Sequence, residues 1–409
     1  MFVPLDATPR DYAWGSTTAM AELLGTTPSG GPEAELWLGA HSGRPTPIAA
    51  GAPVSEHADL ADWFASDPRT ALGDRSELPF LLKILAAAHP LSLQAHPSLA
   101  RAADGFDEEE RRGIPLDAAH RNYKDRLHKP ELIVALRDGF QALCGFRELS
   151  GTDALLADLA STAPTAEQRA QVEGLRESLA APDGLRTTVA RVLGEPAQDL
   201  VSAVVAAAAG TTAGGDTSSD FAAERALVAR LAEEYPGDPG IVVATLVNLV
   251  TLSAGEALFL PAGNIHAYLD GIGIELMAAS DNVLRGGLTP KHVDVPELLD
   301  VLDFEPRPVP RLEPTHLAEG LDLFVPWDVP DFELLRADVS AADVDSDAAS
   351  EFDLPGPAIA IVTDGEVTLT GKHGSTTLDR GQYAFVTPDE GRLVFTGSGT
   401  VFVATTQGR

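Results

Sequence analysis

The chain is poor in cysteine and in positive charge. Its 409 residues include one cysteine, Cys144, which excludes an intramolecular disulfide and any metal site built on several thiolates. Its 29 Lys and Arg stand against 61 Asp and Glu, a formal net charge of −32. Binding to nucleic acid depends on basic side chains that displace phosphate counterions, so this composition predicts no nucleic-acid partner. Anionic membrane surfaces are disfavoured for the same reason.

Long hydrophobic runs are missing as well. The longest, residues 200–209, is half alanine and half the length of about 20 residues that a membrane-spanning helix needs. Residues 1–14 contain no lysine and no apolar core of signal-peptide length. We therefore expect a cytoplasmic protein without a membrane span. Because 44% of the residues are hydrophobic and 22% charged, the composition is that of a folded chain, long enough for two or three domains.

Hydrophobic periodicity divides the chain into three parts. Short apolar or alternating runs predict strands between residues 78 and 145, and helical spacing replaces them between about 150 and 235. In that helical block Thr165 and Gln168 form a capping-box pattern. Residues 210–219, rich in Gly, Ser and Thr, predict a flexible connector between helices.

Strand patterns return after residue 255. The glycines of residues 271–276, GIGIEL, predict a hairpin turn, and the proline-rich residues 306–314 predict a linker. Beyond the linker, Asp364 and Gly365 predict a second hairpin turn. Several short strands with this punctuation are typical of a sandwich or jelly roll. The sequence therefore predicts a mainly β fold with an α insertion.

The sharpest polar pattern lies in residues 90–97, PLSLQAHP. If this run is a strand, its period of two places Ser92, Gln94 and His96 on one face and the apolar side chains on the other. A polar row on an otherwise apolar strand points to a shared cavity.

Two further segments repeat this pattern. Lys129 and Glu131 share one face in the run KPELIVAL, and His266 and Tyr268 share one face in NIHAYLDG. Together with Gln94 and His96, the carboxylate and the second histidine would form a mixed nitrogen and oxygen site. Such a site suits Zn²⁺, with Mn²⁺, Fe²⁺ and Co²⁺ as competitors. The alternative is that these histidines are ordinary core or surface groups, because their spacing forms no compact metal signature.

Cations are scarce enough that Arg285 and Lys291 attract attention. They occur in the segment ASDNVLRGGLTPKH, close in sequence to Glu275 and Asp281, so surface ion pairs are the alternative to a functional role. The single thiol, Cys144, lies in an apolar run without a histidine on a matching strand, and we expect it to serve packing.

Eight segments carry a family resemblance. The chain resembles the type I mannose-6-phosphate isomerases, zinc-dependent phosphosugar isomerases of the cupin class, and the shared segments run in the family's order up to about residue 302. They are YAWGS at 12–16, AELWLGAHSG at 34–43, PFLLKIL at 79–85, PLSLQAHP at 90–97, NYKDRLHKPELIVAL at 122–136, ALCGFRE at 142–148, FLPAGNIHAYLDG at 259–271, and IELMAASDNVLRGGLTPKHVDV at 274–295.

The resemblance implies roles for particular residues. It implies one zinc ion per chain, and an active-site role for Arg285. It places Lys129 beside the metal, and Ser92 and Lys291 at a pocket for a small sugar phosphate, the only partner expected of a chain that we take to be a monomer. The implied zinc ligands are Gln94, His96, Glu131 and His266.

The family fold implies two cupin-like jelly-roll domains and a helical domain. The catalytic cupin domain would comprise residues 1–147 and 241–305, and the helical domain residues 148–240. Residues 306–409 would form a second cupin-like domain without a metal site.

The implied reaction interconverts mannose 6-phosphate and fructose 6-phosphate through a cis-enediol. Arg285 would stabilise the negative charge of the enediolate. The group that moves the carbon-bound proton is open: Lys129 is a candidate if burial and the metal lower its pKa, and Tyr268 and Glu275, which would also contact the substrate, are alternatives. Two other functions stay open, a cupin isomerase of another phosphosugar and a non-catalytic sugar-binding protein.

Overall fold

The computed structural model describes residues 1–210, 220–340 and 350–408. Its strands form two antiparallel sheets of nine strands each, and most of its helices fall between two runs of strands of the first sheet. The fold is therefore mainly β with a helical insertion, as the sequence predicts. The predicted connector at residues 210–219 lies, after Gly210, outside the described residues.

The first sheet carries the segments that the sequence singled out. Its strands are β2 (Glu35–Leu38), β3 (Phe80–Ala87), β4 (Gln94–Ala95), β5 (Glu131–Ala135), β6 (Phe140–Phe146), β7 (Val247–Leu252), β8 (Ala257–Leu260), β9 (His266–Ala278) and β10 (Leu284–Arg285). They follow the order β10-β4-β9-β3-β2, with β5 paired to β8 and β9 and β6 paired to β7 and β9. The long strand β9 unites the sheet, because its first part pairs with β4 and β6 and its second part with β3 and β5.

The second sheet is built mainly from the last part of the chain. Its strands are β1 (Phe2–Pro4), β11 (Thr315–Ala318), β12 (Leu321–Phe324), β13 (Glu333–Val339), β14 (Ser350–Asp353), β15 (Ala358–Thr370), β16 (Ser375–Asp379), β17 (Tyr383–Val386) and β18 (Arg392–Thr405). The N-terminal strand β1 pairs with β17 and so belongs to this sheet. One hydrophobic cluster contains Ile84 and Leu276 of the first sheet and Ile361 and Phe402 of the second, so the two sheets share a core.

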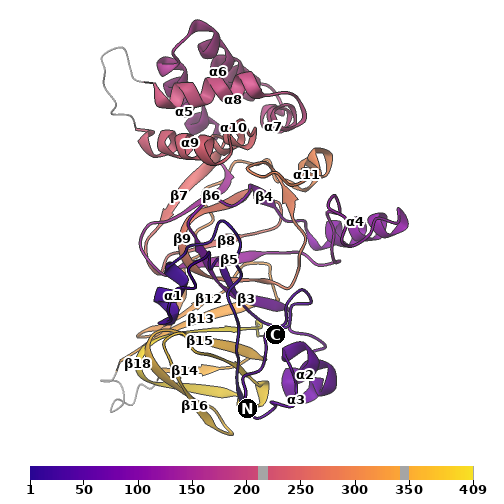
Figure 1. The fold of residues 1–409 in the computed structure, drawn as a ribbon, viewed down its shortest axis with the longest axis vertical. Coiled ribbons are helices and arrows are strands. Elements are labelled where there is room, and N and C mark those ends of the chain that lie inside the picture. Colours follow the sequence, from indigo (N-terminus) through magenta and orange to yellow (C-terminus); the bar gives the residue numbers. More distant parts are fainter. Residues whose placement is uncertain (211–219, 341–349, 409) are drawn as a thin grey trace.

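Helices form one end of the molecule, and the remaining helices lie beside the sheets. They are α1 (Ala19–Leu24), α2 (Leu60–Ser66), α3 (Pro68–Leu72), α4 (Leu99–Arg111), α5 (Leu149–Thr162), α6 (Ala166–Leu179), α7 (Gly184–Gly194), α8 (Gln198–Ala209), α9 (Ala222–Glu234), α10 (Gly240–Ala244) and α11 (Val295–Val301), with a 3₁₀ turn at Pro388–Glu390. We call α5 to α10 the helical block; Figure 1 shows it beyond the first sheet, at the end opposite the second sheet. The helical block is packed against the first sheet, because one hydrophobic cluster contains its residues together with Leu93, Ala267 and Leu284.

The predicted cap is present in the helical block. The Thr165 hydroxyl accepts a hydrogen bond from the Gln168 amide at 3.1 Å, at the start of α6. In the described part of the chain, no single helix is both long and apolar enough to cross a membrane. The bent pair α7 and α8 meets the length and composition test only when its two helices, 107° apart, are taken together.

Two turns predicted from glycine are wrong. Residues 271–276 lie inside the continuous strand β9, where Gly271 has φ +116° and a Cβ atom would meet the Phe140 ring at 2.8 Å. Asp364 and Gly365 lie inside β15, at a register shift in its pairing with β18. In both places glycine permits close strand packing or a bulge rather than a chain reversal.

Two other predicted segments differ in detail. The strand predicted over residues 90–96 is reduced to the two residues of β4, because Leu91 and Leu93 form backbone hydrogen bonds with Tyr268 and Gly287 outside a regular ladder. The proline-rich residues 306–314 do connect α11 to β11, and they also follow the edge of β8, where Phe259 donates its amide to the Pro310 carbonyl.

Candidate metal centre and active site

Three buried side chains from three strands meet in the first sheet. His96, Glu131 and His266 are each about 1% exposed, and their candidate ligand atoms lie within 4.8 Å of one another. Nε2 of His96 lies 3.2 Å from Oε1 of Glu131, and Nε2 of His266 lies 3.3 Å from Oε2. Among the described residues, Nε2 of His96 and Oε2 of Glu131 have no hydrogen-bond partner. Buried polar atoms are rarely left unpartnered, so this group fits a metal ion.

Backbone carbonyls orient both imidazoles toward the centre of this group. Nδ1 of His96 lies 2.7 Å from the Asn282 carbonyl oxygen, and Nδ1 of His266 lies 3.0 Å from the Asn264 carbonyl oxygen. A carbonyl can only accept, so each Nδ1 carries the proton and each Nε2 keeps a free lone pair. This is the outer hydrogen bonding that histidine ligands of metals usually have.

Strand register brings further candidate residues to the same place. Gln94 lies opposite His266 in the pairing of β4 with β9, and Arg285 lies opposite Gln94 in the pairing of β10 with β4. Directly opposed residues of antiparallel strands project from the same face. The Gln94 amide nitrogen lies 3.3 Å from Nε2 of His266, so this side chain completes a four-residue group.

Local charge keeps the group ready for a cation. Burial, and next the Lys129 charge, lower the pKa of His96 to about 4, so its ring is neutral at pH 7. Burial opposes ionisation of Glu131, but the Lys129 ammonium, 2.9 Å from Oε1, and the two histidines together outweigh it and hold the pKa of this carboxyl well below its usual range. Neutral imidazoles and an ionised carboxylate are the protonation states that metal binding requires.

A cavity of about 530 Å³ opens beside this group. Eight of the ten predicted site residues line it: Ser92, Gln94, Lys129, Glu131, Tyr268, Glu275, Arg285 and Lys291. The remaining two, His96 and His266, are buried behind it and reach it through their contacts with Glu131. The structure thus brings the ten residues together.

The surface ion pairs considered for the two cations are not formed. Glu275 pairs with Lys83 at 2.8 Å, and Asp281 pairs with His41 at 3.3 Å. Arg285 and Lys291 have no ion pair or side-chain hydrogen bond within the described ranges, and burial lowers the pKa of both. A cation that is partly buried without a counterion is costly, so these two side chains point to an anionic ligand.

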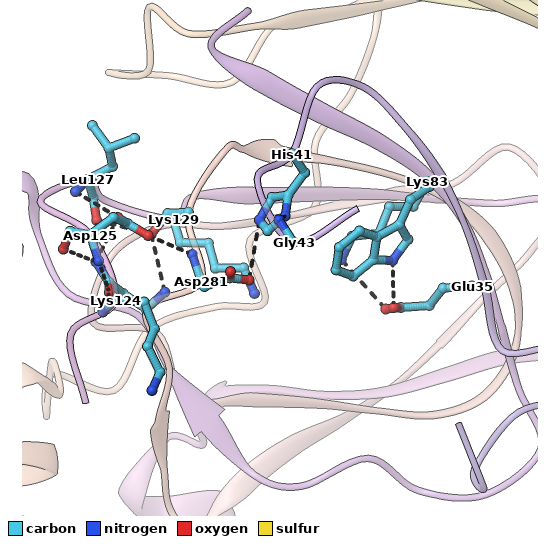
Figure 2. A network of polar contacts seen from close by, with 12 residues as sticks. Glu35, His41, Gly43, Lys83, Lys124, Asp125, Leu127, Lys129 and Asp281 are labelled. Carbon is cyan, nitrogen blue, oxygen red and sulfur yellow. Dashed lines mark hydrogen bonds and ion pairs between the residues drawn. The ribbon is translucent and has the colours of Figure 1, made fainter. Parts of the chain in front are cut away.

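Several cavity residues escaped the sequence reasoning. Lys83 lies in the middle of β3, a strand buried over its whole length, and its Nζ also lies 3.5 Å from Glu35 (Figure 2). The Trp37 ring lies 5.3 Å from this ammonium. The sequence did contain a signal for Lys83, which is a lysine inside an apolar run. Because lysine is almost never fully buried without a partner, such a position indicates a buried acidic neighbour.

The two remaining acidic and phenolic candidates are deeply buried. Burial raises the pKa of Glu275, although the Lys83 charge opposes this, and burial raises the pKa of Tyr268 well above its usual value.

Figure 2 also shows His41 beside Asp281, next to the Asp125 and Lys124 segment.

The single thiol has the packing role that the sequence predicts, although one premise was wrong. Cys144 does have a histidine on the matching strand, since it lies opposite His266 in the pairing of β6 with β9. It is buried, however, and burial raises its pKa to about 12. A thiol that stays protonated at neutral pH is a poor nucleophile.

Comparisons with known proteins agree with this site. Residues 2–149 match the family model described as phosphomannose isomerase type I, catalytic domain. The mannose-6-phosphate isomerase of Escherichia coli (strain K12) is 38% identical over 401 residues, covering 95% of this chain and 96% of that protein. The mannose-6-phosphate isomerase of Bos taurus is 32% identical over 416 residues, covering 95% and 93%.

A solved structure matches along the whole chain. It is the mannose 6-phosphate isomerase from Salmonella typhimurium bound to its substrate, fructose 6-phosphate, and zinc, with 33% identity, a TM-score of 0.84 and coverage of 99% of both chains. Identity above 30% over nearly the full length accompanies the same fold, which agrees with the resemblance seen in the sequence. The chain therefore belongs to the type I mannose-6-phosphate isomerase family.

Proposed function

We propose that this chain is a zinc-dependent isomerase that interconverts mannose 6-phosphate and fructose 6-phosphate. One observation carries the proposal: in a family member, a buried group of metal-ligand type adjoins the cavity that is lined by two cations without an ion pair among the described residues. The first can hold a Lewis acid beside a sugar carbonyl, and the second can hold the negative charge of a phosphorylated substrate.

One zinc ion per chain would be held by His96, Glu131, His266 and Gln94. The Gln94 amide would present its oxygen to the zinc ion. A 180° rotation of the amide group exchanges its oxygen and nitrogen and so brings the oxygen to this position. When bound, zinc polarises a carbonyl oxygen and stabilises negative charge that develops on it. The four residues are a nitrogen and oxygen set of the kind that zinc accepts.

The cationic residues would bind and orient the sugar phosphate. Ser92 and Lys291, both in the cavity wall, would contact the phosphate group, and Arg285 would stabilise the negative charge of the enediolate. Guanidinium stays protonated at any working pH, so its charge is available throughout the reaction.

The isomerisation requires a proton to move between C1 and C2 and another between their oxygens, through a cis-enediol. Lys129, Tyr268 and Glu275 all line the cavity and are the candidates for this transfer and for substrate contact. Lys129 lies 2.9 Å from Glu131 and so adjoins the metal group, whereas Glu275 forms an ion pair with Lys83 at 2.8 Å. A general base must be within hydrogen-bond reach of the proton that it removes, so a structure with bound substrate would decide among the three.

We also propose the domain division that the sequence suggested. The two antiparallel sheets would be two cupin-like jelly rolls, residues 1–147 with 241–305 and residues 306–409, and residues 148–240 would form the helical domain. The exception is β1, which pairs with the second sheet. Location in the cytoplasm and a monomeric state stay predictions, which fractionation and light scattering would test.

A coupled assay tests the function. Purified protein with mannose 6-phosphate should form fructose 6-phosphate, lose activity with a chelator, and regain it with zinc. Turnover that a chelator leaves unchanged, in protein shown to be metal-free, would contradict the proposal. A panel of other aldose phosphates separates this reaction from that of a related isomerase.

A ligand variant supplies the matching control. His266→Ala should lose bound zinc and activity together, because it removes one of the buried ligands. His316→Ala, on the exposed strand β11 of the second sheet, should keep both.

A further inference from the structure

Residues 235–239 join α9 to α10 within the helical block and contact two walls of the cavity. Tyr235, which follows α9, lines the cavity and donates its hydroxyl to the Pro90 carbonyl oxygen at 2.6 Å. Asp238 faces another wall, residues 285–291, which carry Arg285 and Lys291 and which we call the cation loop. In Figure 1 the helices α9 and α10 on either side of this connection lie at the base of the helical block, near the first sheet.

The Asp238 carboxylate accepts three backbone hydrogen bonds. Oδ1 accepts from the amide of Gly240 at 2.7 Å and from that of Leu288 at 2.9 Å, and Oδ2 accepts from the amide of Thr289 at 3.1 Å. Two of the three donors therefore belong to the cation loop. Hydrogen bonds to an ionised acceptor are stronger than neutral ones, so this carboxylate is a firm attachment point.

The backbone of the cation loop needs such an attachment. Leu288 has φ +55°, in the left-handed region that residues other than glycine adopt only when their surroundings hold them there. Gly287 and Gly240 meet backbone to backbone, since a Cβ atom on Gly287 would lie 2.6 Å from Cα of Gly240. The helical block and the loop are thus fitted together at the residues that Asp238 binds.

The same loop carries the two cationic side chains that would bind the substrate. Arg285, Leu288, Thr289 and Lys291 line the cavity, and the Thr289 hydroxyl accepts a hydrogen bond from the Lys291 amide at 3.1 Å. Within the described ranges neither cationic side chain has a partner of its own. The pairing of β10 with β4 sets the place of Arg285, and the backbone of the loop sets the place of Lys291.

We propose that Asp238 is a positioning residue for the anionic substrate, which fixes the cation loop so that Lys291 faces the phosphate-bearing sugar beside Arg285. The helical block then takes part in substrate recognition, through one carboxylate at its junction with the sheet. This inference rests on the proposed function only in taking a sugar phosphate as the ligand of the cavity.

The test compares Asp238→Asn with the wild-type enzyme. Because the variant replaces an ionised acceptor by an amide of the same shape, the KM for mannose 6-phosphate and the dissociation constant of inorganic phosphate should both rise about tenfold, as for one lost hydrogen bond to a charged group. Zinc content should equal that of the wild type, because the metal group is built elsewhere. The kcat should fall less than about threefold, because Arg285 keeps its place in the pairing of β10 with β4.

A matched control comes from the same helical block. Glu224 pairs with Arg147 at 2.9 Å and joins α9 to the end of β6, away from the cation loop. Glu224→Gln should leave the KM and the phosphate affinity within about twofold of wild type. An equal rise in both variants would mean that any loosening of the block weakens binding, and would overturn the specific role of Asp238.

A double variant separates positioning from general stability. In a Lys291→Gln background, Asp238→Asn should raise the KM less than about threefold, because the charge that it positions is already gone. A full tenfold rise in that background, or no rise in the single variant, would overturn the inference. If Asp238→Asn cannot be purified, Asp238→Ser, which keeps a hydroxyl acceptor, gives the same comparison.

The two proposals fail in different ways. Absence of turnover in zinc-loaded wild-type protein would remove the isomerase function, whereas the ratio of phosphate affinities between wild type and Asp238→Asn would still decide the role of Asp238. Normal turnover with equal phosphate affinities would remove the role of Asp238 alone.

Discussion

Replacing Lys83 by methionine should destabilise the folded protein strongly, and more at high pH than at low pH. The side chain of Lys83 is 7% exposed, and its ammonium lies 2.8 Å from Glu275 and 3.5 Å from Glu35, whose side chains are 3% and 9% exposed. Lys83→Met keeps the apolar stem and removes the charge. The variant would leave two buried carboxylates without their counterion.

The magnitude follows from these distances. At an effective dielectric constant of about 20, the attraction amounts to ~6 kcal/mol for Glu275 and ~5 kcal/mol for Glu35. The cost of taking Lys83 out of water offsets part of this sum. Removal of one partner from a buried ion pair generally costs about 3–5 kcal/mol, and we expect a loss of that size in the free energy of unfolding at pH 8.

The pH dependence has a definite sign. Burial already raises the pKa of Glu275 above its ordinary value of 4.5, and removal of the Lys83 charge raises it further. Above pH 4.5 the folded variant therefore binds a proton that the unfolded chain has lost, and its stability falls as the pH rises toward the folded-state pKa. The deficit relative to wild type should be smaller at pH 5.5 than at pH 8.

Urea unfolding of zinc-loaded protein measures the effect, followed by tryptophan fluorescence because Trp37 lies over the Lys83 ammonium. The exposed Lys372→Met should change the free energy of unfolding by less than about 0.5 kcal/mol. Addition of Glu275→Gln to Lys83→Met should recover much of the loss. A deficit below about 1 kcal/mol at pH 8, or one that is the same at both pH values, would refute the reasoning.

Two further predictions concern the cation of the cavity and the thiol. Arg285→Ala should keep its zinc but lower kcat by about a hundredfold or more, because it removes charge stabilisation where negative charge develops; steady-state kinetics with metal analysis checks this, and an unchanged kcat would exclude Arg285 from the mechanism. Cys144 should react with a thiol reagent in the native protein at pH 8 far more slowly than after unfolding, because burial raises its pKa to about 12; equal rates would show that the thiol is accessible.

Periodicity was a sound guide where a face of an element meets a core. Thr165 caps α6 as its spacing with Gln168 predicts, and the strand patterns around Glu131 and His266 correspond to β5 and β9. It failed at Gly271 and Gly365, where a local turn signal was overruled by strand pairing. A glycine that admits a bulge or a close neighbour is indistinguishable in sequence from one that reverses the chain.

The sequence by itself determined the chemistry available to this protein. It contains the imidazole, carboxylate and amide groups of a nitrogen and oxygen metal site, it lacks the thiolates of other sites, and its few cations include Arg285 and Lys291. These properties depend on residue type and on the alternation of strands, both of which are local.

Only the tertiary structure decided which of these groups act together. Arg285, Gln94 and His266 form a row because β10, β4 and β9 pair in one register. That register depends on pairing between residues far apart in the chain, so the sequence of each strand alone does not reveal it. The same holds for Lys83 with Glu275 and for Asp238 with the cation loop. Partner choice is a property of the packed fold, because packing decides which of these side chains meet.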